Sequence, residues 1–236
     1  MEKEFIKKRS LSKEEIFKNK LDYFSNQIVD GLGKGIEPGI LEQVVYLNLL
    51  GFYTTTSCEG HIDSHGYPFG YIKFGSPQEN DSRLLSNTVF NEVRNRAFQL
   101  EKEKFPDFDG SSEKYTADID DFFHKNMEEG LQNHPLYNDY LKETSEINHF
   151  TQLEKAKIIN LVEEFKQSFP ECQEDIYIDS ELAMPNIYFT NKDSYALFNN
   201  DRTNNSTELR NDIHQKSILV MNRFNIFLKN KFEKMT

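Results

Sequence analysis

Apolar residues recur at helical spacing along most of the chain, and short aromatic or β-branched runs interrupt them in two places. Ser12, followed three residues later by Glu15, has the pattern of a capping box and predicts the start of the first helix. Pro38 suits the first turn of a second, strongly apolar helix, which Gly51 ends. The whole pattern predicts helices over residues 11–30, 38–50, 81–104, 119–130, 151–168 and 207–233.

The interrupting runs predict two pairs of β-strands. Residues 52–56 and 69–74 form the first pair, joined by a polar loop over residues 57–68. Residues 175–182 and 186–191 form the second pair. Strands that come in neighbouring pairs among helices are typical of an α+β fold, so we expect a small, mainly antiparallel sheet packed with long helices.

The chain is short enough to fold as one unit. Its 236 residues predict a single α+β domain over residues 1–236. Within it, residues 105–118 carry glycine, serine and charged residues between two helices, and they predict a mobile segment. The closing helix is expected to bury an apolar stripe made of Ile213, Ile218, Leu219, Met221, Phe224, Phe227 and Leu228.

The charge of the chain narrows the classes of partner. Its formal net charge is −11 and its isoelectric point is near 5.1, so we expect no broad basic face for nucleic acid. No stretch reaches the roughly 18 apolar residues of a membrane span, and the charged start lacks the apolar region of a secretory signal. We therefore expect a cytoplasmic protein in which Cys58 and Cys172 are reduced. A small-molecule ligand and a homo-oligomer both stay open.

The loop after the first strand holds the densest group of residues able to do chemistry. Cys58, His61 and His65 have the spacing Cys-x2-His-x3-His. Thiolate and imidazole are good zinc ligands, and short loops often bring such ligands together. Asp63 could add a carboxylate, although the sequence holds no second paired cluster. The pattern predicts a zinc site with Cys58, His61 and His65 as ligands.

Two other interpretations of this loop need no metal. In the first, a strand that enters a tight, glycine-containing turn exposes Cys58 as a nucleophile, with His61 as base and Glu59 as acid, base or orienting group. In the second, Cys58 is a small buried apolar residue and His61 bonds the backbone of its turn. The density of polar and reactive side chains favours a functional site in this loop, because Ser, Thr, Cys, Glu, His and Asp occur within ten residues only here.

The segment IEPGILEQVVYLNLLGFYTTTSCEGH carries two resemblances. It resembles uncharacterised bacterial and phage proteins that have a Leu-Asn-x2-Gly-Phe-x-Thr-x2-Ser-Cys-Glu-Gly-His motif. At the level of this motif, it is distantly similar to the tRNA wybutosine-synthesis methyltransferases, which use S-adenosylmethionine. The chain departs from that second family at Glu59, where the family has serine, and at His61, where it has arginine. The matching residues are Leu47, Asn48, Thr55, Ser57, Cys58 and Gly60.

We expect a ligand-binding or active site on the strand-end loop over residues 54–65. Contacts with the ligand are expected from Thr55, Ser57, Gly60 and Asn48, since glycine permits close approach and the others offer hydrogen bonds. The leading hypothesis is an enzyme with small-molecule or nucleotide-type chemistry, with metal assistance if the loop binds zinc. The alternative is a non-catalytic binding or regulatory module of phage or bacterial origin.

Overall fold

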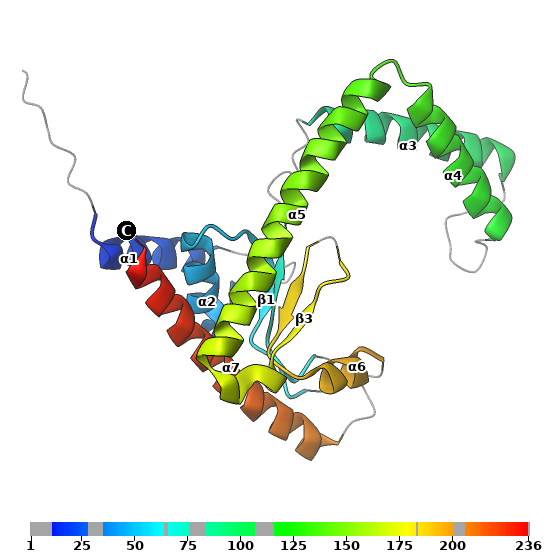
Figure 1. The fold of residues 1–236 in the computed structure, drawn as a ribbon. Coiled ribbons are helices and arrows are strands. Elements are labelled where there is room, and N and C mark those ends of the chain that lie inside the picture. Colours follow the sequence, from blue (N-terminus) through cyan, green and yellow to red (C-terminus); the bar gives the residue numbers. More distant parts are fainter. Residues whose placement is uncertain are drawn as a thin grey trace, which may run out of the picture. The chain divides into compact units, whose positions relative to one another are not determined.

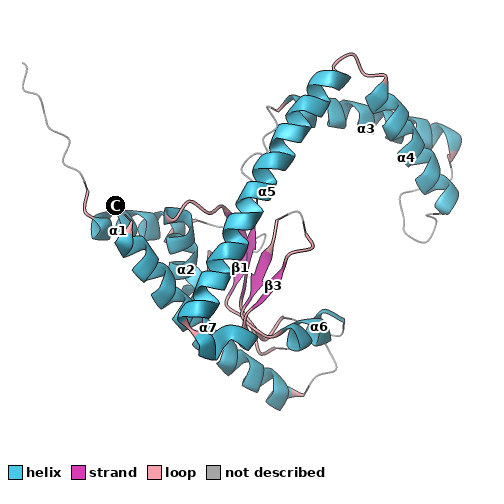
Figure 2. Ribbon diagram, viewed as in Figure 1, coloured by secondary structure: helices cyan, strands magenta, loops and turns pink. Residues whose placement is uncertain are grey.

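The described part of the chain consists of helices and one small antiparallel sheet (Figure 1 and Figure 2). The computed structural model describes residues 11–27, 35–63, 66–75, 84–106, 116–182, 184–200 and 206–235. The helices are α1 (Lys13–Ser25), α2 (Pro38–Leu49), α3 (Leu85–Lys104), α4 (Ala117–Gln132), α5 (Tyr137–Ser168), the 3₁₀ helix η1 (Pro170–Asp175), α6 (Lys192–Asn200) and α7 (Thr207–Lys234). The strands are β1 (Thr54–Cys58), β2 (Tyr71–Phe74), β3 (Tyr177–Asp179) and β4 (Asn186–Tyr188). The predicted α+β class is confirmed.

The chain divides into two compact units. The larger unit combines residues 1–75 with residues 153–236, and the smaller unit comprises residues 76–152. The boundary between them falls within α5, which is one continuous helix. The single domain over residues 1–236 stays a prediction, and the expected mobile segment at 105–118 falls largely outside the described residues.

The sheet belongs to the larger unit and has two unlike faces. Its strand order is β1-β2-β4-β3, and each neighbouring pair is antiparallel. Ile72, Ile187 and Ile178 lie opposite one another across three strands and pack into the main core. Apolar side chains of α2, α5 and α7 complete this core. On the other face, Tyr71 and Tyr188 belong to a separate aromatic cluster.

Local sequence explains how two of the helices begin and face the core. The capping box of α1 is confirmed, because Ser12 Oγ accepts from the Glu15 N–H at 3.2 Å and Glu15 Oε2 accepts from the Ser12 N–H at 2.8 Å. In α7 the predicted apolar stripe is wrong at Leu219, whose exposed fraction is 57%. Residues 218–221 are four consecutive apolar residues, spread over about 300° of the helix circumference, so they cannot all face one core.

The smaller unit rests on the packing of α3 against α4. Its buried cluster consists of Val93, Ala97 and Met127. The carboxylate of Glu143 on α5 accepts hydrogen bonds from the backbone N–H groups of Leu85 and Ser86 at the start of α3. Those N–H groups have no partner inside the helix, so Glu143 caps it, and the bonds hold the pKa of this carboxyl below its usual value. Among the described residues, no helix combines the length and apolar character needed to cross a membrane.

Candidate functional site

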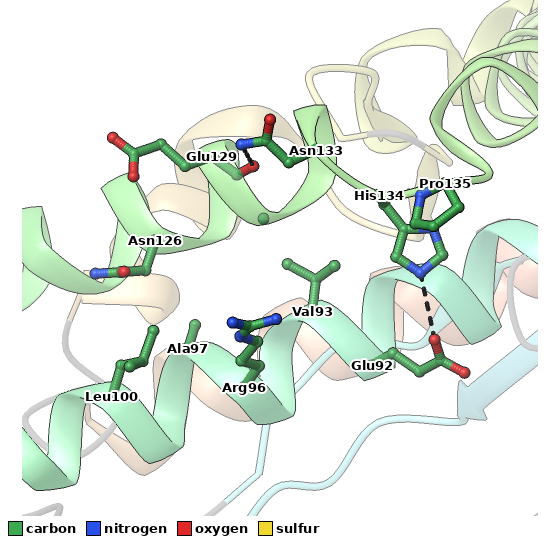
Figure 3. Close-up of a pocket in the computed structure, with 11 residues that line it drawn as sticks. Glu92, Val93, Arg96, Ala97, Leu100, Asn126, Glu129, Asn133, His134 and Pro135 are labelled. Atoms are coloured by element: carbon green, nitrogen blue, oxygen red, sulfur yellow. Dashed lines mark hydrogen bonds and ion pairs between the residues drawn. The ribbon is translucent and has the colours of Figure 1, made fainter.

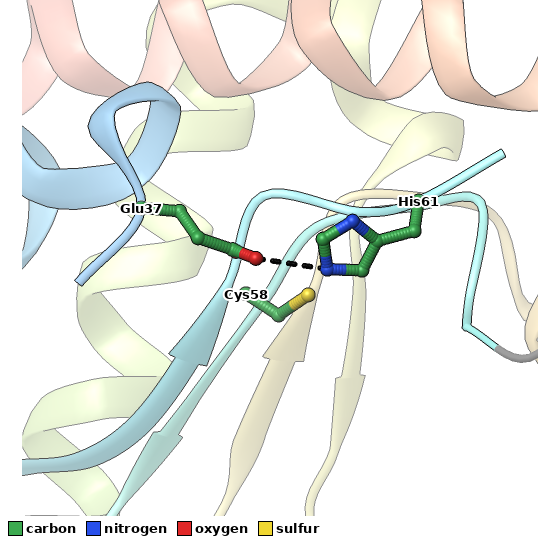
Figure 4. A group of neighbouring side chains, drawn as sticks. All are labelled: Glu37, Cys58 and His61. Atoms are coloured by element: carbon green, nitrogen blue, oxygen red, sulfur yellow. Dashed lines mark ion pairs between the residues drawn. The ribbon is translucent and has the colours of Figure 1, made fainter. Parts of the chain in front are cut away.

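Three potential metal-binding side chains meet at the end of β1 (Figure 4). Glu37, Cys58 and His61 each offer one ligand atom, and all three atoms lie within 4.8 Å of one another. The closest pair is His61 Nε2 and Glu37 Oε1, which are 2.8 Å apart. All three residues are half-buried, and the side chains of His61 and Glu37 are 42% and 30% exposed. The cluster is therefore both assembled and accessible.

Hydrogen bonds from backbone N–H groups to carboxylate side chains join the start of α2 to the end of β1 and so bring Glu37 to the cluster. Glu37 is the residue just before α2, where Pro38 opens the helix. Its Oε2 accepts the N–H of Glu59 at 2.7 Å. In return, Glu59 Oε2 accepts the N–H of Gly39 in the first turn of α2, also at 2.7 Å. A carboxylate at a helix N-terminus is stabilised by the free N–H groups there, so each segment holds the other in place.

Gly60 makes the turn that carries His61 back toward Cys58. Its φ is +92°, a left-handed conformation that L side chains rarely adopt. A Cβ at this position would lie 2.8 Å from the carbonyl carbon of Phe69, so the turn is pressed against the backbone. The N–H of His61 then donates to the carbonyl oxygen of Tyr67 at 2.7 Å. The histidine backbone is thus fixed by the same turn.

The start of α7 holds the rest of the loop through polar residues on one helix face. Arg210, His214 and Ser217 are spaced by four and three positions, so they share that face. The buried guanidinium of Arg210 donates to the backbone carbonyl oxygens of Ile62 (3.0 Å), His61 (3.4 Å), Gly66 (2.6 Å) and Asp63.

The other two residues of this face act further along the loop. His214 Nδ1 lies 3.1 Å from the carbonyl oxygen of Pro68, and Ser217 Oγ accepts the N–H of Gly70 at 2.9 Å. We call Arg210, His214 and Ser217 the α7 clamp. Because it bonds main-chain atoms, the clamp sets the path of the loop and leaves the side chain of His61 unoccupied by it.

The thiol of Cys58 is held in its neutral form when no cation is nearby. Burial raises the pKa of Cys58 to about 12, and the negative charges of Glu37 and Glu59 add to this effect. The Gly60 N–H, 3.4 Å from the sulfur, acts in the opposite direction but is outweighed. A free thiolate nucleophile at neutral pH therefore has no support from these surroundings. A divalent cation would reverse the balance, because it favours the thiolate.

The raised pKa predicts slow alkylation of Cys58 in protein stripped of metal. At pH 8 a thiol of pKa about 12 is deprotonated roughly a thousand times less than an ordinary cysteine, so iodoacetamide should react slowly. The rate should rise about tenfold per pH unit beyond pH 9, whereas in urea-unfolded protein it should be half-maximal near pH 8.5 and level off by about pH 10. Cys58→Ser serves as the control, since Cys172 is fully buried. A plateau below pH 9 in the folded protein would contradict the prediction.

The structure brings only some of the predicted site residues together. Cys58 and His61 are in the cluster, and Glu59 lies beside it with its carboxylate on the Gly39 N–H. His65, the third predicted ligand, lies outside the described residues. Its contribution as a ligand stays a prediction, as does a catalytic role for Glu59.

The predicted ligand-binding residues are spread over α2, β1 and the turn after it. Asn48 donates to the Val44 carbonyl and to Thr54 Oγ1, each at 2.9 Å, so it ties α2 to the start of the strand. Thr55 Oγ1 donates to the Lys73 carbonyl at 3.4 Å, and Ser57 lies opposite Ile72, on the other face from Cys58. Gly60 alone adjoins the cluster by its position in the turn. Ligand contacts from these four residues stay a prediction.

Sequence reasoning missed Glu37 and the α7 clamp. Glu37 lies in a glycine-rich stretch that is typical of a simple turn. However, an acidic residue directly before a proline that opens a helix could have indicated a functional carboxylate. The clamp had a signal as well, since Arg210, His214 and Ser217 interrupt the apolar side of α7 at helical spacing. Their partners, which are backbone carbonyl groups and one backbone N–H some 147 residues away, leave no mark in the local sequence.

A cavity in the smaller unit is a weaker candidate (Figure 3). It measures about 500 Å³ and lies between α3 and α4, with Val93 and Ala97 among its lining residues. The side chains of its two asparagines bond to backbone carbonyl groups of α4: Asn126 donates to Phe122 and Asn133 donates to Glu129. His134 Nε2 pairs with Glu92 at 3.3 Å. Few of its polar groups are left to converge on a ligand, which is what a binding site needs.

Comparisons of the chain with protein-family models, with curated proteins and with solved structures find no match. The two resemblances carried by the motif ending in Ser57, Cys58, Glu59, Gly60 and His61 stay predictions. The Glu37, Cys58 and His61 cluster is therefore the basis for the proposed function of the protein.

Proposed function

We propose that the protein binds a zinc ion through Glu37, Cys58 and His61 and uses it in metal-assisted chemistry on a small molecule. The observation that carries the proposal is the convergence of three different ligand atoms, from two segments of chain, within 4.8 Å. Zinc is the metal of choice because it readily accepts thiolate, imidazole and carboxylate ligands in one site.

Charge balance supports an ion at this position. A carboxylate and a thiolate with neutral imidazole carry two negative charges, which one zinc ion neutralises. Without a cation, burial together with the charges of Glu37 and Glu59 keeps the Cys58 thiol protonated, as its raised pKa indicates. Zinc binding should therefore displace the thiol proton, and affinity should increase with pH.

The spacing of the ligand atoms is compatible with tetrahedral coordination after small side-chain adjustments. Zinc lies about 2.0–2.3 Å from its ligands, so the ligand atoms of a tetrahedral site are roughly 3.3–3.8 Å apart. The His61–Glu37 pair, at 2.8 Å, would open slightly, and the Cys58 sulfur would close in from at most 4.8 Å. The loop backbone can stay as it is, because the α7 clamp and Gly60 already fix it.

Three protein ligands leave a coordination position for water or a ligand, which is the pattern of catalytic rather than structural zinc sites. When bound in such a site, zinc lowers the pKa of water to about 7 and polarises carbonyl or phosphoryl oxygens. The protein residues would hold the ion and orient the loop around it. A small-molecule substrate fits better than nucleic acid, because the chain has a net charge of −11 and the site itself is acidic.

Zinc titration of three substituted proteins tests the proposal. Wild-type protein should bind one zinc ion, and Cys58→Ser, His61→Ala and Glu37→Gln should each weaken binding by roughly a hundredfold or more. His124→Ala is the matched control, because His124 is exposed on α4 and pairs with the nearby Asp120. Calorimetry gives the affinity, and elemental analysis gives the stoichiometry.

Two results would count against the proposal. Wild-type protein that takes up no zinc, or variants that bind as tightly as wild type, would remove the metal centre. If those variants also unfolded at lower urea concentration, the Glu37–His61 pair would be a structural lock. The non-catalytic binding module would then be the better account of the loop.

A further inference from the structure

A row of tyrosines crosses the sheet beside the proposed zinc site. The register of the strands places Cys58 opposite Tyr71, Tyr71 opposite Tyr188, and Tyr188 opposite Tyr177. Directly opposed residues in an antiparallel sheet point to the same face, with neighbouring Cβ atoms about 5 Å apart. The four side chains thus form one row, with the zinc ligand Cys58 at its end. We call Tyr71, Tyr188 and Tyr177 the tyrosine row.

The rings of the row contact one another in sequence. The centroids of Tyr71 and Tyr188 are 6.1 Å apart, and those of Tyr188 and Tyr177 are 6.0 Å apart with nearly parallel planes. Tyr195 on α6 packs 4.4 Å from Tyr188 and helps to bury it to 6% exposure. Tyr71 stays half-buried, so the ring next to Cys58 keeps part of its surface accessible.

Tyr71 shares its surroundings with the metal-binding cluster. The ring centroids of Tyr71 and Tyr67 are 6.2 Å apart in an edge-to-face contact. The carbonyl oxygen of Tyr67 accepts the N–H of His61. A phenol is uncharged at neutral pH, so Tyr71, directly opposite Cys58, presents a neutral aromatic surface next to the ion-binding side chains. Such a surface attracts planar rings through offset or edge-to-face contacts.

We propose that the substrate carries a planar aromatic ring attached to its zinc-binding group, and that the ring packs against Tyr71. This inference rests on the proposed zinc centre and names the class of molecule that it would take. The register supports it, since a ligand bound to an ion at Cys58 has Tyr71 as the nearest neighbour on the same face. The apolar face of the sheet offers no such position, because Ile72 and Ile187 are fully buried there.

Two hydroxamates that differ only by a ring test this inference on the zinc-loaded full chain. Acetohydroxamate and benzohydroxamate bring the same zinc-binding group, and calorimetry gives both affinities. We expect Tyr71→Val to weaken benzohydroxamate binding by about three- to tenfold while changing acetohydroxamate binding by less than about twofold. Tyr71→Phe keeps the ring and should retain wild-type affinity for both. Tyr53→Val is the control, because Tyr53 is 46% exposed and precedes β1 at its far end from Cys58.

The outcomes separate the two proposals. Equal loss of both hydroxamates in Tyr71→Val, or no loss of either, overturns the aromatic substrate while leaving the zinc centre intact. Zinc uptake without binding of either hydroxamate also overturns it, because the ion would have no open position. Failure of the wild-type chain to take up zinc overturns the proposed function itself, and elemental analysis of each variant detects that case.

Discussion

Arg210→Met should lower the free energy of unfolding by about 3 kcal/mol and weaken zinc binding by roughly 10- to 100-fold. The guanidinium is buried, with an exposed fraction of 4%, and it donates to four backbone carbonyl groups between His61 and Gly66. Methionine keeps most of the apolar volume, including packing over the Phe198 ring, but donates no hydrogen bond. Carbonyl groups left without partners are costly, and a loop without its clamp no longer holds His61 in position.

Urea unfolding followed by tyrosine fluorescence measures the stability effect, since the chain has no tryptophan. Arg223→Met is the matched control on the same helix. Arg223 is partly exposed and pairs with Glu171 at 3.8 Å, so its loss should cost less than about 1 kcal/mol. Arg210→Lys should fall in between, because lysine keeps the charge but lacks the planar fork. Equal effects at the two arginines would show that the clamp does not hold the loop.

Gly60→Ala should cost about 3 kcal/mol, clearly more than Gly51→Ala at about 1 kcal/mol. The two glycines have nearly the same φ, +92° and +91°. Alanine is strained at both for that reason. Only at Gly60 would the new Cβ also meet backbone, 2.8 Å from the Phe69 carbonyl carbon, whereas nothing lies within 4 Å at Gly51. Backbone cannot move aside as a flexible side chain can, so the difference between the variants isolates the close approach.

The same unfolding measurement, with zinc titration beside it, checks this pair. We expect Gly51→Ala to keep wild-type zinc affinity, and Gly60→Ala to lose affinity because the turn that returns His61 toward Cys58 is displaced. If both variants lose the same stability and keep the same affinity, the turn at Gly60 is looser than its contact distances indicate.

Elements with a strong local signal were predictable from sequence. The first helix has its Ser12 and Glu15 capping box, and the helix that follows has Pro38 at its start. The four strands were predicted near their observed positions, within a few residues at each end. Three helical stretches were missed: residues 137–150 of α5, which are rich in polar residues, and the short helices η1 and α6. A polar or short helix gains its stability from tertiary packing, so its own sequence indicates it weakly.

The residues of the candidate site also differ in how well the sequence predicts them. Cys58 and His61 were predicted because they stand in one loop, where spacing alone brings their ligand atoms near. Glu37 joins them through the reciprocal bonds between α2 and the end of β1, which no local pattern encodes. Arg210 reaches the loop from α7, 144 to 149 residues further along the chain. Partners that depend on tertiary structure are set by the arrangement of elements, which periodicity does not specify.

The α7 clamp has a consequence for the order in which the site matures. Glu37, Cys58 and His61 fall within 25 consecutive residues, so they can approach one another through short-range chain closure. The clamp joins positions about 147 residues apart, and contacts of such long sequence separation form slowly because ordering the intervening chain costs entropy. On a ribosome, the three ligands would emerge well before Arg210. The proposed site would then become rigid only when α7 docks, so any selectivity it has among metals would depend on that late contact.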